Sequence, residues 1–234
     1  MEEKSHFYNT LLIISGYFPT LLWVAPIFNL FTKWKRLNKV FKSFFYFALI
    51  MFLINLLVQG FLWSASEHYS FWKPYLDYWH IENVLFTRII FHISCFIFIG
   101  YCYFTIIPLY FLNKYKFLII SVLCILSTVI YIFIDNYQGY GTIGQNLYHF
   151  FLVSTTLVYL SYLFKLRPNN NITKVPFFWI SFGFLIPNAV TLIFQITAQN
   201  LYDNDFVLYC QIYIFGNAIE MIGIILMLVG LRKI

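Results

Sequence analysis

Two charged residues lie inside long apolar runs of this chain, where water is not available to solvate their charges. Arg88 stands about one helical turn into the run 84–107, and Glu220 stands near the middle of the run 206–231. A carboxyl group in hydrocarbon must be protonated or paired, so such residues by default face a bundle interior or a water-filled cavity. We therefore interpret Glu220 as a ligand-binding or proton-carrying group. Arg88 is close enough to the end of its run for its guanidinium group to reach the interface instead.

Neutral polar residues accompany these two charges at helical spacing. His92 follows Arg88 by four positions and Asn217 precedes Glu220 by three, so each pair shares a helix face. His92 is nearer in depth to Glu220 than Arg88 is, so His92 is the better candidate partner for the Glu220 carboxyl group. The predicted ligand-binding set is Glu220, Asn217, His92, Arg88, Asn188, His149, Gln59, Asn55 and Gln211. Most of these residues lie in the outer half of the runs. This distribution predicts a cup-shaped cavity that opens to the outside, with Glu220 near its floor.

Each member of this set also has a purely structural interpretation. Asn, Gln and His side chains within a bundle often serve only as hydrogen-bonding links between helices. Pro187, beside Asn188, interrupts its run and permits a bend, which makes that run a candidate moving element. A static kink explains the same proline equally well.

Several chemistries lack the residues that they need. The last run contains no Lys, so a retinal Schiff base is excluded and no cofactor is expected. The chain has no H-E-x-x-H or G-x-S-x-G sequence, and none of its four cysteines belongs to a C-x-x-C pair. We expect neither a metal site nor a catalytic site.

The elements that must position these residues are seven apolar runs, each about long enough to cross a bilayer. They cover about 11–31, 42–64, 84–107, 115–134, 145–164, 175–197 and 206–231. The chain is 61% hydrophobic and 10% charged, against about 25% charged residues in soluble domains. Because backbone groups in lipid must satisfy one another, the runs should be helices. The sequence predicts an all-α membrane protein with one seven-helix domain over 1–234 and no soluble domain.

The remaining charges are sorted between alternate connecting segments. One set contains Lys33, Lys35, Arg36, Lys39, Lys42, Lys114, Lys116, Lys165, Arg167, Lys174, Arg232 and Lys233, with no acid. The other contains Glu2, Glu3, Glu67, Asp77, Glu82, Asp135, Asp203 and Asp205, with only Lys4 and Lys73 as cations. Since short basic loops stay cytoplasmic, we predict an N-terminus outside and a C-terminus inside a plasma (inner) membrane. The net charge of +6 follows from these loops and does not indicate a nucleic-acid partner.

A weak internal repeat also shows in the sequence. The stretch 84–100 aligns with 207–223, and Phe52–Asn55 is similar to Phe184–Asn188 with Pro187 inserted. The pattern predicts two parallel three-helix units joined by the fourth run, as in SWEET-like sugar transporters. Chance identities between apolar helices are the alternative.

Three stretches carry a resemblance that covers the whole chain. They read LLIISGYFPTLL near the start, FFWISFGFLIPNAVTLIF in the sixth run and FGNAIEMIGIILMLVGL in the seventh. Together they resemble a family of uncharacterised bacterial seven-helix membrane proteins. The resemblance implies a separate histidine kinase as partner and supplies no functional residues.

Two functions remain open from the sequence. The first is a sensory or receptor-type subunit that binds a small ligand in the outer half of the bilayer and signals through a separate membrane or cytoplasmic protein. The second is a small-solute transporter of two three-helix units, in which Glu220 could carry a proton. An intramembrane enzyme ranks third because no catalytic residues are recognisable.

Overall fold

The computed structural model describes residues 14–78, 87–134, 143–166 and 171–234. The described residues form helices and no strands, and seven of the helical segments are long and apolar enough to cross a membrane. These segments are Ile14–Thr32, Lys39–Ala65, Ile89–Ile106, Tyr110–Phe133, Ile143–Leu166, Pro176–Ala198 and Phe206–Leu231. The predicted all-α, seven-helix membrane fold is therefore confirmed.

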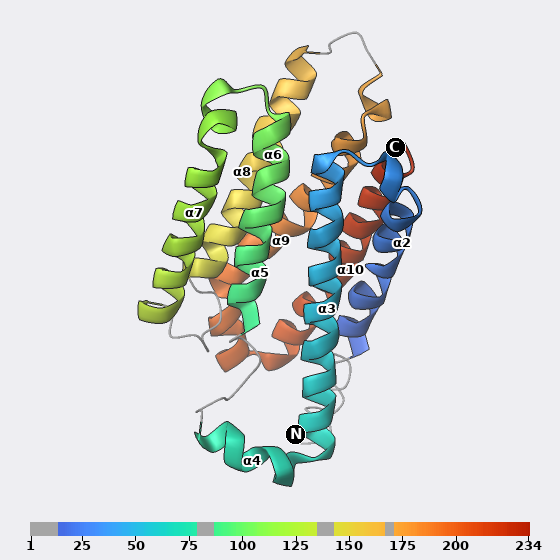
Figure 1. The fold of residues 1–234 in the computed structure, drawn as a ribbon. Helices are drawn as coiled ribbons and strands as arrows, with labels where there is room; N and C mark the ends of the chain where they lie inside the picture. The colour runs from blue at the N-terminus through green and yellow to red at the C-terminus, as the bar shows by residue number, and fades with distance from the viewer. Residues whose placement is uncertain (1–13, 79–86, 135–142, 167–170) are drawn as a thin grey trace.

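Figure 1 labels the α-helices that make up these spans, and a π-helix, η3, lies between α5 and α6. They are α2 (Val24–Thr32), α3 (Lys39–Glu67), α5 (Arg88–Ser94), the π-helix η3 (Cys95–Ile99), α6 (Gly100–Ile106), α7 (Tyr110–Phe133), α8 (Ile143–Leu166), α9 (Pro176–Asn204) and α10 (Phe206–Leu231). Three short helices lie between spans: η1 (Trp34–Arg36), α4 (Tyr69–Tyr78) and η4 (Ile172–Lys174).

Consecutive spans are neighbours in space, and the first and last close the ring. Helix α2 packs on α3, α3 on η3 and α6, α6 on α7, α7 on α8, α8 on α9, α9 on α10, and α10 on α2. In Figure 1, α7 lies at the edge of the bundle, whereas α9 passes behind the gap between α3 and α6. The predicted repeat of two three-helix units is not confirmed by this arrangement.

Charged residues mark the two ends of the bundle. The end that holds Lys33, Lys114, Lys165, Lys174 and Arg232 is called the basic end below, and the end that holds Glu67, Asp77, Asp203 and Asp205 is called the acidic end. The C-terminus lies at the basic end and α4 at the acidic end (Figure 1). The side of the membrane that each end faces remains the prediction made from the charges.

Helix α7 begins at Tyr110, five residues before the predicted boundary, and it includes two lysines. The ammonium group of Lys114 lies 5.1 Å from the centre of the Tyr115 ring, and that of Lys116 lies 5.1 Å from the centre of the Tyr101 ring. Aromatic rings at an interface can hold a cation while its alkyl stem covers apolar surface. The lysines therefore extend the helix rather than end it.

The last two helices, α9 and α10, are joined by a single residue. Helix α9 continues to Asn204, and Asp205 caps the start of α10 by accepting a hydrogen bond from the Leu208 backbone N–H at 3.0 Å. At the other end of α10, the Lys33 ammonium group donates to the Leu231 carbonyl at 2.8 Å. A cation at a helix C-terminus also interacts favourably with the helix dipole.

Two glycines allow α9 and α10 to pack closely. A Cβ atom on Gly183 would lie 2.5 Å from the Gly223 carbonyl oxygen, and a Cβ on Gly223 would lie 2.5 Å from both the Gly183 carbonyl oxygen and Pro187 Cγ. Small residues permit such contact in membrane proteins, where packing replaces the hydrophobic effect as the force between helices. This contact places the Pro187 segment of α9 directly against α10.

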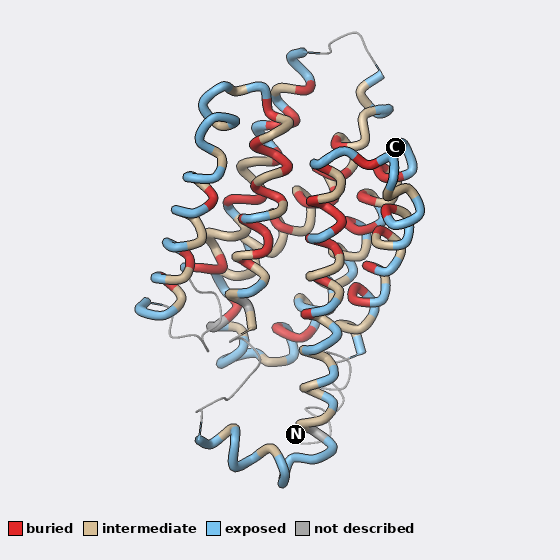
Figure 2. The backbone as a smooth tube through the Cα atoms, viewed as in Figure 1, coloured by how far each residue is buried: buried red, intermediate tan, exposed pale blue. Residues whose placement is uncertain are grey.

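Buried residues gather toward the basic half of the bundle (Figure 2). Six aromatic side chains that pack there are called the aromatic plug: Phe44, Phe47, Tyr103, Tyr159, Phe177 and Phe184. The Tyr103 hydroxyl group, which the sequence did not distinguish from other tyrosines, shares a 2.9 Å hydrogen bond with the buried Ser181 hydroxyl. The plug thus links α3, α6, α8 and α9.

Candidate functional site

A cavity of about 310 Å³ lies among the helices on the acidic side of the aromatic plug. Six of the seven spans contribute to its wall, and no described residue of α7 does. Along α10 the lining extends from Tyr213 to Met227, a rise of about 21 Å at 1.5 Å per residue. Its volume is at the lower end of the range for small-molecule pockets.

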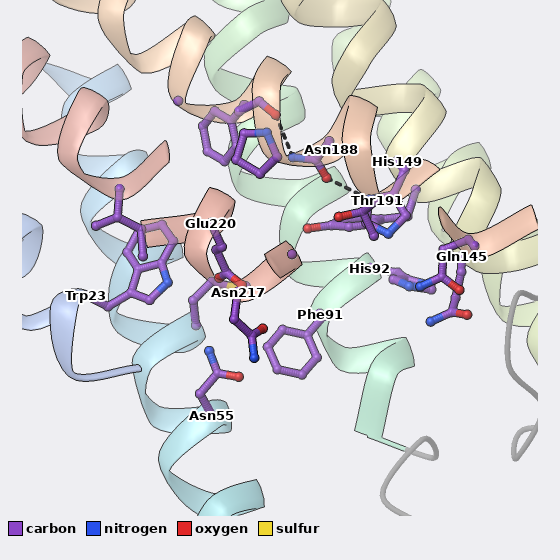
Figure 3. Close-up of a pocket in the computed structure, with 18 of the residues that line it drawn as sticks. Trp23, Asn55, Phe91, His92, Gln145, His149, Asn188, Thr191, Asn217 and Glu220 are labelled. Carbon is purple, nitrogen blue, oxygen red and sulfur yellow. Dashed lines mark hydrogen bonds between the residues drawn. The ribbon is translucent and has the colours of Figure 1, made fainter. Parts of the chain in front are cut away.

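Six members of the predicted set line this cavity. They are Asn55 on α3, His92 on α5, His149 on α8, Asn188 on α9, and Asn217 and Glu220 on α10. These residues come from five helices and span 166 positions, so only the tertiary fold brings them together. Figure 3 shows Glu220, Asn217 and Asn55 at one side of the cavity and His92 and His149 at the other.

Glu220 lies close to the middle of α10, beside the ring of Trp23 from the first span (Figure 3). The Trp23 indole nitrogen is buried, faces the carboxyl group and makes no hydrogen bond of normal geometry. Its ring is held edge-on against Phe47, with the ring centres 5.9 Å apart. One turn toward the acidic end, the Asn217 amide donates to the Ser15 hydroxyl at 2.9 Å. Asn217 therefore connects the first and last spans at the level of the cavity.

The opposite side of the cavity contains a hydrogen-bonded chain. The Asn188 amide nitrogen donates to the Phe184 carbonyl at 2.7 Å, and the Asn188 amide oxygen lies 2.7 Å from His149 Nδ1. Because that amide oxygen can only accept, His149 Nδ1 must carry a proton. In the neutral ring, Nε2 is then the acceptor nitrogen. The chain fixes the orientation of both side chains.

Pro187 precedes Asn188 within the continuous helix α9. Proline has no N–H, so the Gly183 carbonyl, four residues earlier, lacks its usual helical partner. The Asn188 side chain takes up the carbonyl of Phe184, one turn earlier. The proline is tolerated because neighbouring polar groups and close packing stabilise this part of α9.

His92 stacks on Tyr148, with ring centres 4.9 Å apart and an angle of 17° between the rings. It lies on the last turn of α5, just before the π-helix η3. A π-helical turn changes the rotation of the residues that precede it relative to those that follow, and such turns occur frequently at functional sites. The Ser43 hydroxyl donates to the Phe98 carbonyl within η3 at 3.0 Å, which links this turn to α3.

The other three predicted residues do not line the cavity within the described structure. Gln59 lies between the first two spans, where a Cβ on Gly16 would come within 2.8 Å of its amide nitrogen. Gln211 is exposed near the acidic end of α10. Arg88 begins α5, but its side chain lies outside the described residues.

The predicted set omitted several lining residues. Gln145, Thr191 and Gln195 add polar groups, and Trp23, Tyr148 and Tyr213 add aromatic surface. Two signals could have found some of them. Gln145 precedes His149 by four residues and shares its helix face, and Trp23 lies in the middle of its run, away from the interfaces where tryptophan is usual.

The described wall of the cavity combines polar and aromatic side chains. Among the described residues, no group of three or more His, Cys, Asp or Glu side chains is placed to hold a metal ion. The wall offers one carboxyl group, two imidazoles, several amides and seven aromatic rings. Phe47 and Phe184 of the aromatic plug are also part of the wall.

Comparisons with protein-family profiles, curated proteins and solved structures find no match for this chain. The resemblance to bacterial seven-helix proteins gains no support from them. What this protein does must therefore be inferred from the cavity itself.

Proposed function

We propose that this protein is a receptor-type membrane subunit that binds a small ligand in the cavity and transmits binding to a separate partner protein. One observation carries the proposal: polar groups from five helices line one cavity, and the same wall includes Phe47 and Phe184 of the packed aromatic plug on its basic side. A ligand that enters from the acidic side can contact α3, α5, α8, α9 and α10 at once. Such a ligand favours whichever arrangement of these helices it fits best.

The tight packing of α9 against α10 supports transmission to the basic end. Both helices line the cavity and extend to the basic end, where Pro176 is in contact range of Gly230. A displacement of Asn188 or Glu220 must therefore be taken up along the whole contact. The basic end carries many lysines and arginines, which suit an acidic partner surface or anionic lipid headgroups.

Cysteine labelling tests the proposal without knowledge of the ligand. We expect Thr191→Cys, in the cavity wall, to react with a membrane-impermeant thiol reagent applied to the acidic side. Ser181→Cys, which lies within the plug beside Tyr103 and is fully buried, should react from neither side. The native cysteines are replaced by serine in both variants, because all four lie within spans.

A small-solute transporter is the alternative, and Pro187 on α9 is the observation that favours it. Alternating access requires the basic side to open in part of the cycle. Labelling of Ser181→Cys from the basic side would contradict the receptor proposal and support transport. Failure to recover any other protein with the gently solubilised subunit would also argue against a receptor.

A further inference from the structure

We propose that the cavity selects an organic cation, a small protonated amine with an apolar body, and that Glu220 is its counter-ion. This inference deepens the proposed function and depends on the cavity being a ligand site. It rests on the charges of the wall, on the acceptor atoms near Glu220 and on its aromatic surface.

The formal charge of the described wall comes from Glu220. No Lys or Arg is among the described residues that line the cavity. Figure 3 places the nearest imidazoles, His92 and His149, across the cavity from the carboxyl group. An ionised carboxylate in such surroundings is costly unless a cation joins it. A cationic ligand supplies that charge, whereas an anionic ligand would meet repulsion.

Hydrogen bonds within the protein orient several polar groups of the wall. The Asn188 amide donates to the Phe184 carbonyl, and the Asn217 amide donates to the Ser15 hydroxyl. On the Glu220 side of the cavity, the wall presents the two carboxyl oxygens of Glu220 and the amide oxygens of Asn55 and Asn217, all of which are acceptors. A protonated amine carries up to three donors and no acceptor, as lysine does. The wall and such a ligand are therefore complementary.

Aromatic rings supply the remaining recognition. Seven lining residues are Trp, Tyr or Phe, and Trp23 stands next to the Glu220 carboxyl group. A cation over an aromatic face is attracted by the ring quadrupole, most strongly by Trp. Met51, Ile224 and Met227 continue the wall toward the plug and offer an apolar surface for the body of the ligand.

Three small probes of similar size and different charge test the inference. They are 2-phenylethylamine (a cation at pH 7), 2-phenylethanol (neutral) and 3-phenylpropionate (an anion). Each is titrated into the purified protein in lipid nanodiscs, and its affinity is measured from the shift in thermal unfolding midpoint. We expect the amine to bind at least about tenfold more tightly than the alcohol and the propionate to bind more weakly than either, since a tenfold difference corresponds to about 1.4 kcal/mol.

Variants assign the preference to Glu220. Glu220→Gln should remove the preference for the amine and leave the alcohol unchanged within about twofold, because the amide keeps the shape without the charge. Glu220→Asp keeps the charge and should retain the preference. Glu67→Gln, at the exposed end of α3, is the matched control and should behave as the wild type.

Each contrary result has a distinct meaning. Equal binding of amine and alcohol, or an amine preference that survives Glu220→Gln, would overturn the cation inference and leave the cavity as a ligand site. Tighter binding of the propionate would overturn it in favour of an anion site. If none of the three probes binds, the inference fails, and the labelling of Thr191→Cys separately decides whether the cavity is accessible.

Discussion

At the scale of single residues, the cavity is organised by hydrogen bonds between helices that are distant in sequence. Asn188 accepts from His149 across 39 positions, and Asn217 donates to Ser15 across 202. The structural and the ligand-binding interpretations of such polar residues are therefore not exclusive here. The same bonds that link helices also decide which atoms of Asn188, His149 and Asn217 face a ligand.

The bond between His149 and Asn188 should be measurable as a coupling free energy. In a double-mutant cycle of His149→Phe and Asn188→Leu, we expect coupling of about 0.6 kcal/mol and at most about 1.7 kcal/mol, as found for hydrogen bonds between membrane helices. The measurement is the free energy of unfolding in mixed micelles. The control cycle pairs His149→Phe with Gln211→Leu, whose exposed side chain should make the two effects additive. Additivity in the first cycle as well would contradict the bond.

At the scale of elements, α9 and α10 form the most closely packed pair around the site. Their contact depends on the absence of side chains at Gly183 and Gly223, and it brings Pro187 against α10. The helical turn around Pro187 is thus enclosed by packing on one side and by the Asn188 hydrogen bonds on the other. Any movement of α9 must preserve or exchange this contact, because packed interfaces change between discrete arrangements.

Substitution of the glycines should separate packing from helix propensity. Gly223→Ala places a methyl group 2.5 Å from a carbonyl oxygen and from Pro187 Cγ, so we expect a loss of about 1–3 kcal/mol in unfolding free energy. Gly216→Ala, seven residues earlier on the same helix, meets nothing within 4 Å and serves as the matched control. It should be neutral or slightly stabilising, since alanine favours helix over glycine. Equal effects of the two changes would show that the helices do not make this contact.

At the scale of the whole molecule, both the charged residues and the cavity are distributed unequally between the two ends of the bundle. The polar wall lies toward the acidic end, and the aromatic plug lies toward the basic end. If basic loops face the cytoplasm, the cavity receives ligand from outside and the basic end is available to a cytoplasmic or membrane partner. The proposed direction of signalling depends on this orientation.

The orientation can be tested by labelling both ends. In a background without native cysteines, Asp77→Cys on α4 should react with an impermeant thiol reagent in intact cells, and Lys114→Cys on α7 should react only after permeabilisation. Both positions are exposed, so burial does not confound the comparison. Each variant is the control for the other. The reverse pattern would place the cavity mouth in the cytoplasm and require an internal ligand.

Several boundaries followed directly from hydropathy, while others needed local contacts. The seventh span agrees with its predicted bounds of 206–231, since both of its ends meet charged residues. Helix α7 starts early, at Tyr110, and Lys114 in its first turns lies over the Tyr115 ring, a contact that hydropathy does not report. The π-helix Cys95–Ile99 has no hydropathy signal, because its residues are as apolar as the α-helical turns around them.

The candidate site also contains some residues that the sequence could identify and others that only the structure revealed. Glu220, Asn217, His92 and Asn188 could be selected from sequence because polar groups in apolar runs are costly and need a reason to be there. Gln59 and Gln211 satisfied the same criterion, and only the packing showed that neither lines the cavity. Trp23 became informative only when its ring was found beside Glu220.

The sequence by itself determined that this chain crosses a membrane with seven helices, because hydrocarbon imposes length and apolarity on every span independently of its neighbours. Only the tertiary structure decided which faces of those helices meet. The helix faces that meet are decided by close contacts, such as that of Gly183 with Gly223, and by hydrogen bonds, such as that of His149 with Asn188. Hydropathy reports neither kind of interaction. For that reason the span count could be derived from composition, whereas the cavity, its plug and its polar wall could not.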